Sequence, residues 1–533
     1  MNTKAFFPII FLVLISISSV AFGQQQDYMV GKLFDSETNE PVVFANIRIK
    51  DRAVGIITNV DGSFRIPLKY KEYGDIIEIS SMGYETKELP INDFSQDELN
   101  IVTISPAAIS LQEAVVKAKG KRRLSAKQIV QRAIDAIPRN FPTTSFSTIG
   151  YYRDYQKGKG QYINLNEAIL EVFDQGFDQL DDASTETRLL YFQMNSDFEQ
   201  DSMAWASYDY QSLSKIIEKA FLDIAGGNEF RILRVHDAIR NYNVFSYDFI
   251  GTLKTDLINN HSFSKAPDTS IDNQDLYCIS FKVNYPNYRA NGTLYISKLD
   301  FAIYKLEYIM YDENQRNDSN EKNRHGHKQK VIFDITADYR KINDKMYLNY
   351  ISLHNSFILN IRPVFEVDNV GVDIYKRCFV VEYNRKPEEK GSIHLSNYSV
   401  NYRNLQVKLK RIARFKNEIF LYAEDNDERV AKIFDEMKQA EDEGEEALDV
   451  LESLDIQVTN VKDTLGNLVN QWTQREYQQF REFFSQQIKP DTRAPFDVIF
   501  MDKKKPIYEN QNMVKPEEYG YYWMNTPLQG KMN

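Results

Sequence analysis

The stretch that decides the fold reads VGKLFD at residues 30–35, EP at 40–41, ANIRI at 45–49, TNVDGSF at 58–64 and ISSMGY at 79–84. Apolar and polar residues alternate in the longer pieces, and a period of two is typical of half-buried β-strands. Glycine, proline, asparagine and aspartate separate the pieces, and an Asp-Gly pair is a strong hairpin signal. Seven or so short strands at this spacing predict a small β-sandwich.

These residues resemble the carboxypeptidase regulatory-like domain, a prealbumin-like (Ig-like) sandwich. The resemblance rests on the opening segment that ends at Asp35, the Glu-Pro turn, the Ala45–Ile49 strand, the TNVDGSF hairpin and the closing Gly83-Tyr84. It implies an exported protein of Bacteroidota, in which this domain opens many exported proteins, including TonB-dependent outer-membrane receptors. Residues 111–116 resemble the segment that leads out of the domain.

The first 23 residues have the features of a secretory signal. Lys4 precedes an apolar run at 6–20, and Ala21-Phe22-Gly23 provides a small-x-small ending. We expect cleavage before Gln24, with a retained anchor as the weaker alternative because the run is short for a membrane span. No cysteine stands directly after the signal, which argues against a lipid-anchored lipoprotein, and no later segment predicts a transmembrane helix. The predicted location is therefore the periplasm or the periphery of the outer membrane.

The rest of the chain predicts a mainly β protein with helical additions. Ser125 begins a helix with Gln128 in capping-box position, and Pro138 is expected to end it. Helical periodicity also predicts helices over 213–224 and 473–487. The expected organisation is a signal peptide at 1–23, the sandwich at 24–108, a linker and helix at 109–142, an antiparallel β-rich domain with helical inserts at 143–420, an acidic helical region at 421–490 and an irregular tail at 491–533.

Two further resemblances concern the region after the sandwich. Residues 140–168 resemble the second part of a Bacteroidota family of unknown function that carries the same N-terminal sandwich, and whose members continue into an outer-membrane barrel. We expect no such barrel here, because ten-residue strands of alternating hydrophobicity are not evident. The strands at 292–297 and 300–303 are similar to those in the half-barrels of periplasmic lipoprotein carriers.

Composition and motifs favour binding over catalysis. The net charge of −11 argues against a nucleic-acid partner. The six histidines form no zinc-peptidase motif, the pair His325 and His327 lies in a polar loop, and no nucleophile elbow or phosphate loop is present. We therefore expect no enzyme activity, metal or cofactor. The two cysteines, Cys278 and Cys378, form no disulfide framework, and their pairing stays open.

Arg153 and Glu167 are the most interesting polar residues, because both lie in strongly apolar or aromatic surroundings. They form either a structural ion pair or solvated charges at a strand edge, or they contact a ligand or partner together with Tyr152. The predicted function is protein interaction or envelope assembly with other envelope or outer-membrane proteins, through exposed edge strands. A periplasmic carrier of a lipid or other hydrophobic ligand and an exported hydrolase are the alternatives.

Overall fold

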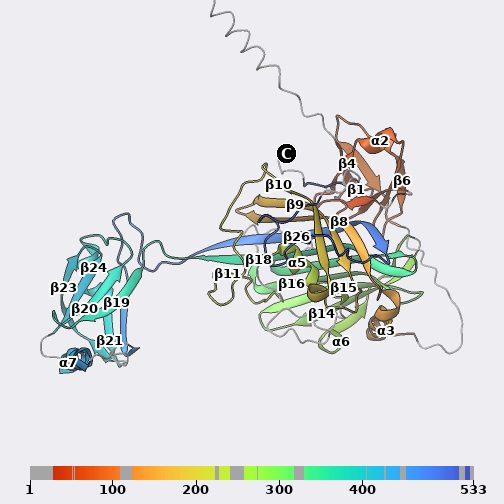
Figure 1. Cartoon of the computed structure of the whole chain (residues 1–533). Coiled ribbons are helices and arrows are strands. Elements are labelled where there is room, and N and C mark those ends of the chain that lie inside the picture. Colours follow the sequence, from red (N-terminus) through yellow and green to blue (C-terminus); the bar gives the residue numbers. More distant parts are fainter. Residues whose placement is uncertain are drawn as a thin grey trace, which may run out of the picture. The chain divides into compact units, whose positions relative to one another are not determined.

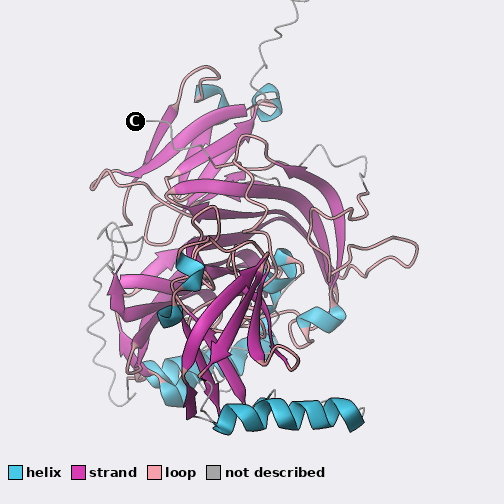
Figure 2. Ribbon diagram, turned by 90° about the vertical axis from the view of Figure 1, so that its left-hand side faces the viewer, coloured by secondary structure: helices cyan, strands magenta, loops and turns pink. Residues whose placement is uncertain are grey.

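The computed structural model describes residues 28–50, 52, 54–107, 123–222, 227–240, 257–272, 274–316, 329–403, 405–424, 428–443, 452–514 and 522–527. The chain divides into two compact units. Unit 1 comprises 1–211, 215–357 and 476–533, and unit 2 comprises 212–214 and 358–475. The predicted signal peptide, the segment 111–116 and the pair His325 and His327 lie outside the described residues. Strands dominate both units (Figures 1 and 2).

The N-terminal part of unit 1 consists of two small sheets that enclose one apolar core. The first sheet contains β4 (Ser63–Pro67), β1 (Tyr28–Asp35) and β7 (Asn100–Ile104), and the second contains β3 (Gly55–Ile57), β2 (Asn46–Ile49), β5 (Ile76–Ser80) and β6 (Lys87–Pro90). Leu33 and Phe64 from the first sheet share the core with Ile47 and Ile79 from the second. A short helix, α2 (Lys69–Glu72), and a 3-10 turn, η1 (Ile91–Asp93), complete this sandwich.

A twelve-stranded sheet forms the rest of unit 1, with neighbours in the order β10-β9-β8-β26-β18-β17-β16-β15-β14-β12. In that order the strands are Glu186–Met194, Gln161–Asp174, Phe146–Gly158, Thr473–Pro490, Lys345–Ile361, Gln329–Ile342, Ile303–Arg316, Tyr288–Ser297, Gln274–Asn284 and Ser262–Lys265. Two short strands, β11 (Lys215–Ile216) and β13 (Thr269–Ile271), pair with β18 and β14. Figure 1 shows the blue strand β26 among the yellow and green strands of this sheet.

Among the described residues, four helices accompany the large sheet: α3 (Ala126–Asn140), α4 (Asp181–Ser184), α5 (Glu229–Val235) and α6 (Leu257–Asn260). The predicted capping box of α3 is confirmed, because the Ser125 hydroxyl accepts from the Gln128 N–H and the Gln128 side chain accepts from the Ser125 N–H. The helix continues past Pro138 and ends at Asn140. Phe281, Tyr308 and Phe333 stack on one another within the sheet.

Two predicted helices are wrong. Residues 473–487 belong to β26, and the described part of 213–224 contains only β11 and turns. In β26, Tyr477, Phe480, Phe483 and Phe484 have helical spacing. The strand is central and both of its faces are covered, so polar residues such as Gln486 are buried as well and the two-residue alternation is hidden.

Unit 2 is inserted between β18 and β26. Its two sheets contain β19 (Val367–Asp373), β20 (Cys378–Tyr383), β24 (Glu418–Ala423) and β23 (Leu409–Phe415), and β22 (Leu405–Val407), β21 (Tyr398–Tyr402) and β25 (Leu454–Val458). Two 3-10 turns, η3 (Gly391–Ile393) and η4 (Leu395–Asn397), precede β21. The helix α7 (Glu428–Glu443) packs on the same core through Ile433 and Phe434. This unit therefore extends across the boundary predicted at residue 420. The described residues of 421–490 complete β24 and form the helix α7 and then the strands β25 and β26, so this part of the chain is helical only near its start.

Neither cysteine is paired in the structure: Cys278 lies on β14 and Cys378 on β20. No helix in the described part of the chain is long and apolar enough to cross a membrane.

Candidate functional site: a polar row and a groove on the large sheet

A line of polar side chains crosses six adjacent strands on one face of the large sheet. In strand order from β17 to β10 this polar row contains Asp334, His354, Glu482, Arg153, Glu167 and Gln193. The ladders place Asp334 opposite His354, Glu482 opposite Arg153, Arg153 opposite Glu167, and Glu167 opposite Gln193. Residues directly opposite each other share a face, and a contact of 3.1 Å between His354 Nε2 and Glu482 Oε1 links β18 to β26, so the row is continuous.

Arg153 is the centre of the row, and protein groups occupy its donors. Its Nε and Nη2 both lie 2.5 Å from Glu482 Oε2. Its Nη1 donates to the Asn59 side-chain oxygen at 2.6 Å and to the Asn525 carbonyl at 2.8 Å. Arg153 therefore joins three parts of the chain: the strand β26, the turn between β3 and β4 of the sandwich, and the C-terminal segment.

Arg153 and Glu482 keep each other charged in spite of their burial. Burial alone would raise the pKa of Glu482, but Arg153 and His354 lower it to about 2. His354 Nε2 lies 3.1 Å from Glu482 Oε1, and its Nδ1 lies 3.5 Å from Asp334 Oδ1. Removing one partner of such a buried pair leaves an uncompensated charge, so the row is sensitive to single substitutions.

Glu167 accepts four hydrogen bonds. The Tyr151 hydroxyl donates at 2.5 Å, the Thr526 hydroxyl at 2.7 Å, and the Gln193 and Asn195 amides at 2.9 and 3.3 Å. Burial, with Glu167 next in effect, raises the pKa of Tyr151, so this phenol stays a donor.

Of the three residues singled out in the sequence, the structure brings Arg153 and Glu167 to the same face and places Tyr152 on the other. The Tyr152 hydroxyl donates to Asp154 at 2.9 Å, and its ring packs edge-on against Phe230 of α5. Sequence reasoning missed Glu482 and Asn525 because both are more than 300 positions from Arg153. The TNVDGSF motif, which supplies Asn59, was the one available signal. It forms a turn between β3 and β4, but these strands lie in different sheets, so the predicted hairpin is not formed.

The sandwich and the C-terminal segment cover the row. The cavity left beside Arg153 and Glu482, lined also by Ile57, Tyr350 and Asn525, has a volume of about 10 Å³. That is about the space of one water molecule, so a substrate has no room there. The row therefore attaches the covering segments to the sheet.

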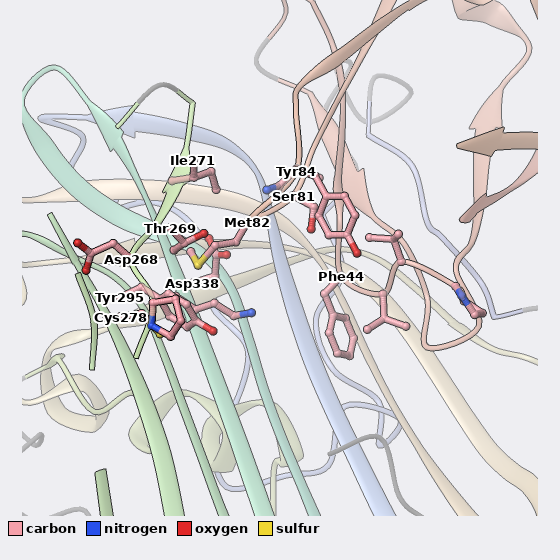
Figure 3. Close-up of a pocket in the computed structure, with 16 residues that line it drawn as sticks. Phe44, Ser81, Met82, Tyr84, Asp268, Thr269, Ile271, Cys278, Tyr295 and Asp338 are labelled. Carbon is pink, nitrogen blue, oxygen red and sulfur yellow. The ribbon is translucent and has the colours of Figure 1, made fainter. Parts of the chain in front are cut away.

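A larger pocket, of about 460 Å³, lies where the sandwich meets the large sheet (Figure 3). The sandwich contributes Phe44, Ser81, Met82 and Tyr84 among others, and the sheet contributes Thr269, Cys278, Tyr295, Lys305 and Asp338. The Gly83 N–H donates to the Ser270 carbonyl at 3.2 Å, so the closing motif of the sandwich contacts β13 directly. Gly83 has a φ of +83°, a conformation that favours glycine at this contact.

A second pocket, of about 640 Å³, is lined by residues of β12, β14, β15 and β16. The ladders place Ser264, Ser280, Thr293 and Glu307 in line on one face. Residues two positions along the same strands, Cys278, Tyr295 and Lys305, line the first pocket and share that face. We call the two pockets together the strand groove.

The groove contains charges of both signs. Lys305 Nζ lies 2.6 Å from Glu307 Oε1, and the Tyr295 hydroxyl donates to Glu307 at 3.4 Å. Burial raises the pKa of Asp338 to about 6, against the opposing effect of Lys305. Burial also raises the pKa of the Cys278 thiol to about 11, so the thiol stays protonated and is a poor nucleophile at neutral pH. Across the described ranges, no group of three or more His, Cys, Asp or Glu residues is placed to hold a metal ion.

Residues 29–116 match the family model of the CarboxypepD_reg-like domain. Over 107 residues the chain is 36% identical to the TonB-dependent receptor SusC of Bacteroides thetaiotaomicron, an alignment that covers 20% of this chain and 10% of the receptor. The match to this relative thus spans about a tenth of its length. The predicted regulatory-like domain is confirmed.

Among solved structures, a LolA superfamily protein from Nitrosomonas europaea aligns with 44% of this chain and 86% of its own, at 10% identity and a TM-score of 0.17. A DUF1329 family protein from Desulfovibrio piger aligns with 44% of this chain and 87% of its own, at 8% identity and a TM-score of 0.19. Superpositions at these scores do not define a shared fold.

Proposed function

We propose that this chain is a non-enzymatic binding component of the cell envelope, and that the strand groove receives an extended segment of a partner protein. The strongest support for this proposal is that two parts of the chain, the sandwich and the large sheet, form the groove together. In the first pocket one wall comes from the CarboxypepD_reg-like domain, and the floor of both pockets comes from the large sheet. The domain match and the similarity to an outer-membrane receptor support an envelope location.

The dimensions and chemistry of the groove suit a polypeptide. Each pocket falls within the range of about 300–1,000 Å³ typical of ligand sites. Hydroxyl groups from Ser264, Ser280 and Thr293 offer donors and acceptors, while Lys305 and Glu307 offer both charges. A polypeptide presents the same mixture of backbone amides, polar groups and apolar side chains.

The rim of the groove offers a place for strand addition. The short strand β12 ends the path of the large sheet, and its residues Ser262, Ser264 and Lys265 are exposed. An exposed sheet edge accepts an extended segment through main-chain hydrogen bonds, while pockets beside it select side chains. The groove lies directly beside this edge.

The geometry favours binding over the two alternatives. A histidine between two carboxylates, as in the row of Asp334, His354 and Glu482, is a possible acid–base arrangement, but the cavity beside Glu482 leaves no room for a substrate. A hydrophobic carrier needs an apolar cavity, whereas both pockets of the groove contain charged and hydroxyl side chains.

A pull-down with a groove-filling variant tests the proposal. Tagged wild type and Ser280→Trp are incubated with outer-membrane fractions of the source cells, with Ser399→Trp as the matched control, since both serines are half-buried strand residues. We expect one envelope protein to be retained by wild type and by Ser399→Trp, and retention by folded Ser280→Trp to fall at least tenfold. Equal retention by all three proteins would contradict the groove, and retention of no envelope protein by wild type would contradict the binding role.

A further inference from the structure

The segment Tyr522–Pro527, here called the tail segment, is enclosed by unit 1 without belonging to any strand. Its residues Trp523 and Asn525 are 2% exposed, and Thr526 is 8% exposed. Its contacts are made mostly by side chains of the large sheet and by the backbone of the sandwich. This is the manner in which proteins hold bound extended peptides.

Two buried side chains of the sheet bind the backbone of the tail segment. Gln486 on β26 donates through Nε2 to the Trp523 carbonyl at 2.5 Å and accepts the Trp523 N–H through Oε1 at 3.3 Å. Arg153 on β8 donates to the Asn525 carbonyl at 2.8 Å. These contacts require an extended backbone and do not depend on which side chains it carries.

The side chains of the tail segment contact groups of the sandwich and the sheet that accept only certain residue types. The Asn525 amide oxygen accepts the Arg65 N–H at 2.9 Å, and its amide nitrogen donates to the Ile57 carbonyl at 2.7 Å. Only a side chain with one donor and one acceptor satisfies both strands of the sandwich, so aspartate and leucine are excluded. The Trp523 ring packs against Tyr70 with centroids 5.2 Å apart, and Thr526 donates to Glu167.

We propose that the sheet and the sandwich together form a peptide-binding site for an extended segment of the type Trp-x-Asn-Thr, occupied in this chain by its own tail segment and able to exchange it. The groups that bind it are held independently of it: Arg153 by Glu482, and Gln486 by its place in a central strand. This site is separate from the strand groove and does not depend on the function proposed above.

A labelled peptide tests the site in the full-length chain. Asn525→Ala/Thr526→Ala weakens the chain's own segment, and a fluorescent synthetic peptide of residues 520–529 with the natural sequence is titrated into it. We expect saturable one-to-one binding to this variant, and binding at least tenfold weaker to wild type, because the attached segment competes at a high effective concentration. A peptide with Asn525→Ala should lose at least tenfold in affinity, whereas the matched Met524→Leu peptide should bind like the natural one.

Two results would overturn the site: no peptide binding to a variant that unfolds cooperatively, or equal affinity for the natural and Asn525→Ala peptides. Should the double variant fail to fold, Asn525→Asp replaces it, since aspartate cannot donate to the Ile57 carbonyl and so weakens the attached segment, and the same two results apply. A dimer of the variant that the natural peptide dissociates would support the site, with a second copy of the chain as the donor.

Discussion

Arg153 joins the turn between β3 and β4, the strand β26 and the tail segment through one guanidinium group. We expect Arg153→Met to lower the free energy of unfolding by about 3–5 kcal/mol, because Glu482 is left buried without its counter-charge. Urea denaturation at pH 7 measures the change.

The double variant Arg153→Met/Glu482→Leu is the control for this prediction. It removes both charges, so it should recover a large part of the loss. A single-variant loss below about 1 kcal/mol, or a double variant less stable than the sum of the two single changes, would contradict the role of the pair.

The buried carboxyl group of Asp154 should make the free energy of unfolding depend on pH. Burial, with Glu229 next, raises the pKa of Asp154 to about 7 from an ordinary 3.8. The folded state therefore binds a proton that the unfolded state releases, so this stabilising contribution is present below pH 4 and is lost as the pH rises towards 7. Its size is roughly 4 kcal/mol for about three pKa units.

We expect Asp154→Asn to remove this component, so that the difference in unfolding free energy between variant and wild type changes steadily between pH 4 and 7. Unfolding curves recorded at several pH values measure it, with the exposed Asp97→Asn as control. If the difference in unfolding free energy between Asp154→Asn and wild type stayed constant from pH 4 to 7, the raised pKa of the buried Asp154 carboxyl group would be contradicted.

At the scale of elements, the contact between β8 and β26 depends on close backbone approach. A side chain at Gly150 would place its Cβ 2.4 Å from the Phe484 carbonyl oxygen and 2.5 Å from the Phe483 ring. We expect Gly150→Val to destabilise unit 1 by about 3 kcal/mol or more, since backbone cannot give way as a flexible side chain can. Thermal unfolding measures this loss, and the near-isosteric Thr148→Val on the same strand is the control. Equal melting temperatures of the Gly150→Val and Thr148→Val variants would contradict the predicted close contact.

Elements with local signals could be predicted from sequence, and elements defined by distant neighbours could not. The Ser125 and Gln128 capping box and the Asp61-Gly62 turn depend on residues a few positions apart, and both are found. The sequence of β26 predicts a helix, because coverage of both faces removes the alternation of polar and apolar residues that identifies a strand. Its neighbours in the sheet, β8 and β18, lie more than a hundred residues away in the sequence.

At the scale of the whole molecule, unit 2 is an insertion between two strands that are neighbours in the large sheet. We expect a chain in which a short glycine-containing turn replaces residues 362–472 to keep unit 1 folded, with a melting temperature within a few degrees of that of the full chain. Circular dichroism and calorimetry measure this. An unfolded product, alongside a correctly folded full chain, would contradict the independence of the two units.

The candidate site could be predicted only in part, because it forms from separated segments of the chain. The sequence indicated Arg153 and Glu167 by their apolar surroundings, and the ladder places them opposite each other. Glu482 and Asn525 lie 329 and 372 positions from Arg153, and the groove needs both the sandwich and the strands after residue 262. No local pattern brings such segments together.

The central claim is that the strand groove binds a partner protein, and site-specific photo-crosslinking in intact source cells tests it most directly. A photoreactive phenylalanine analogue is placed at Ser280 or Thr293 in the groove, or at Ser399 as control. We expect one discrete adduct with the same envelope protein from both groove positions and none from position 399. No adduct at either groove position, or the same adducts from all three positions, would contradict it.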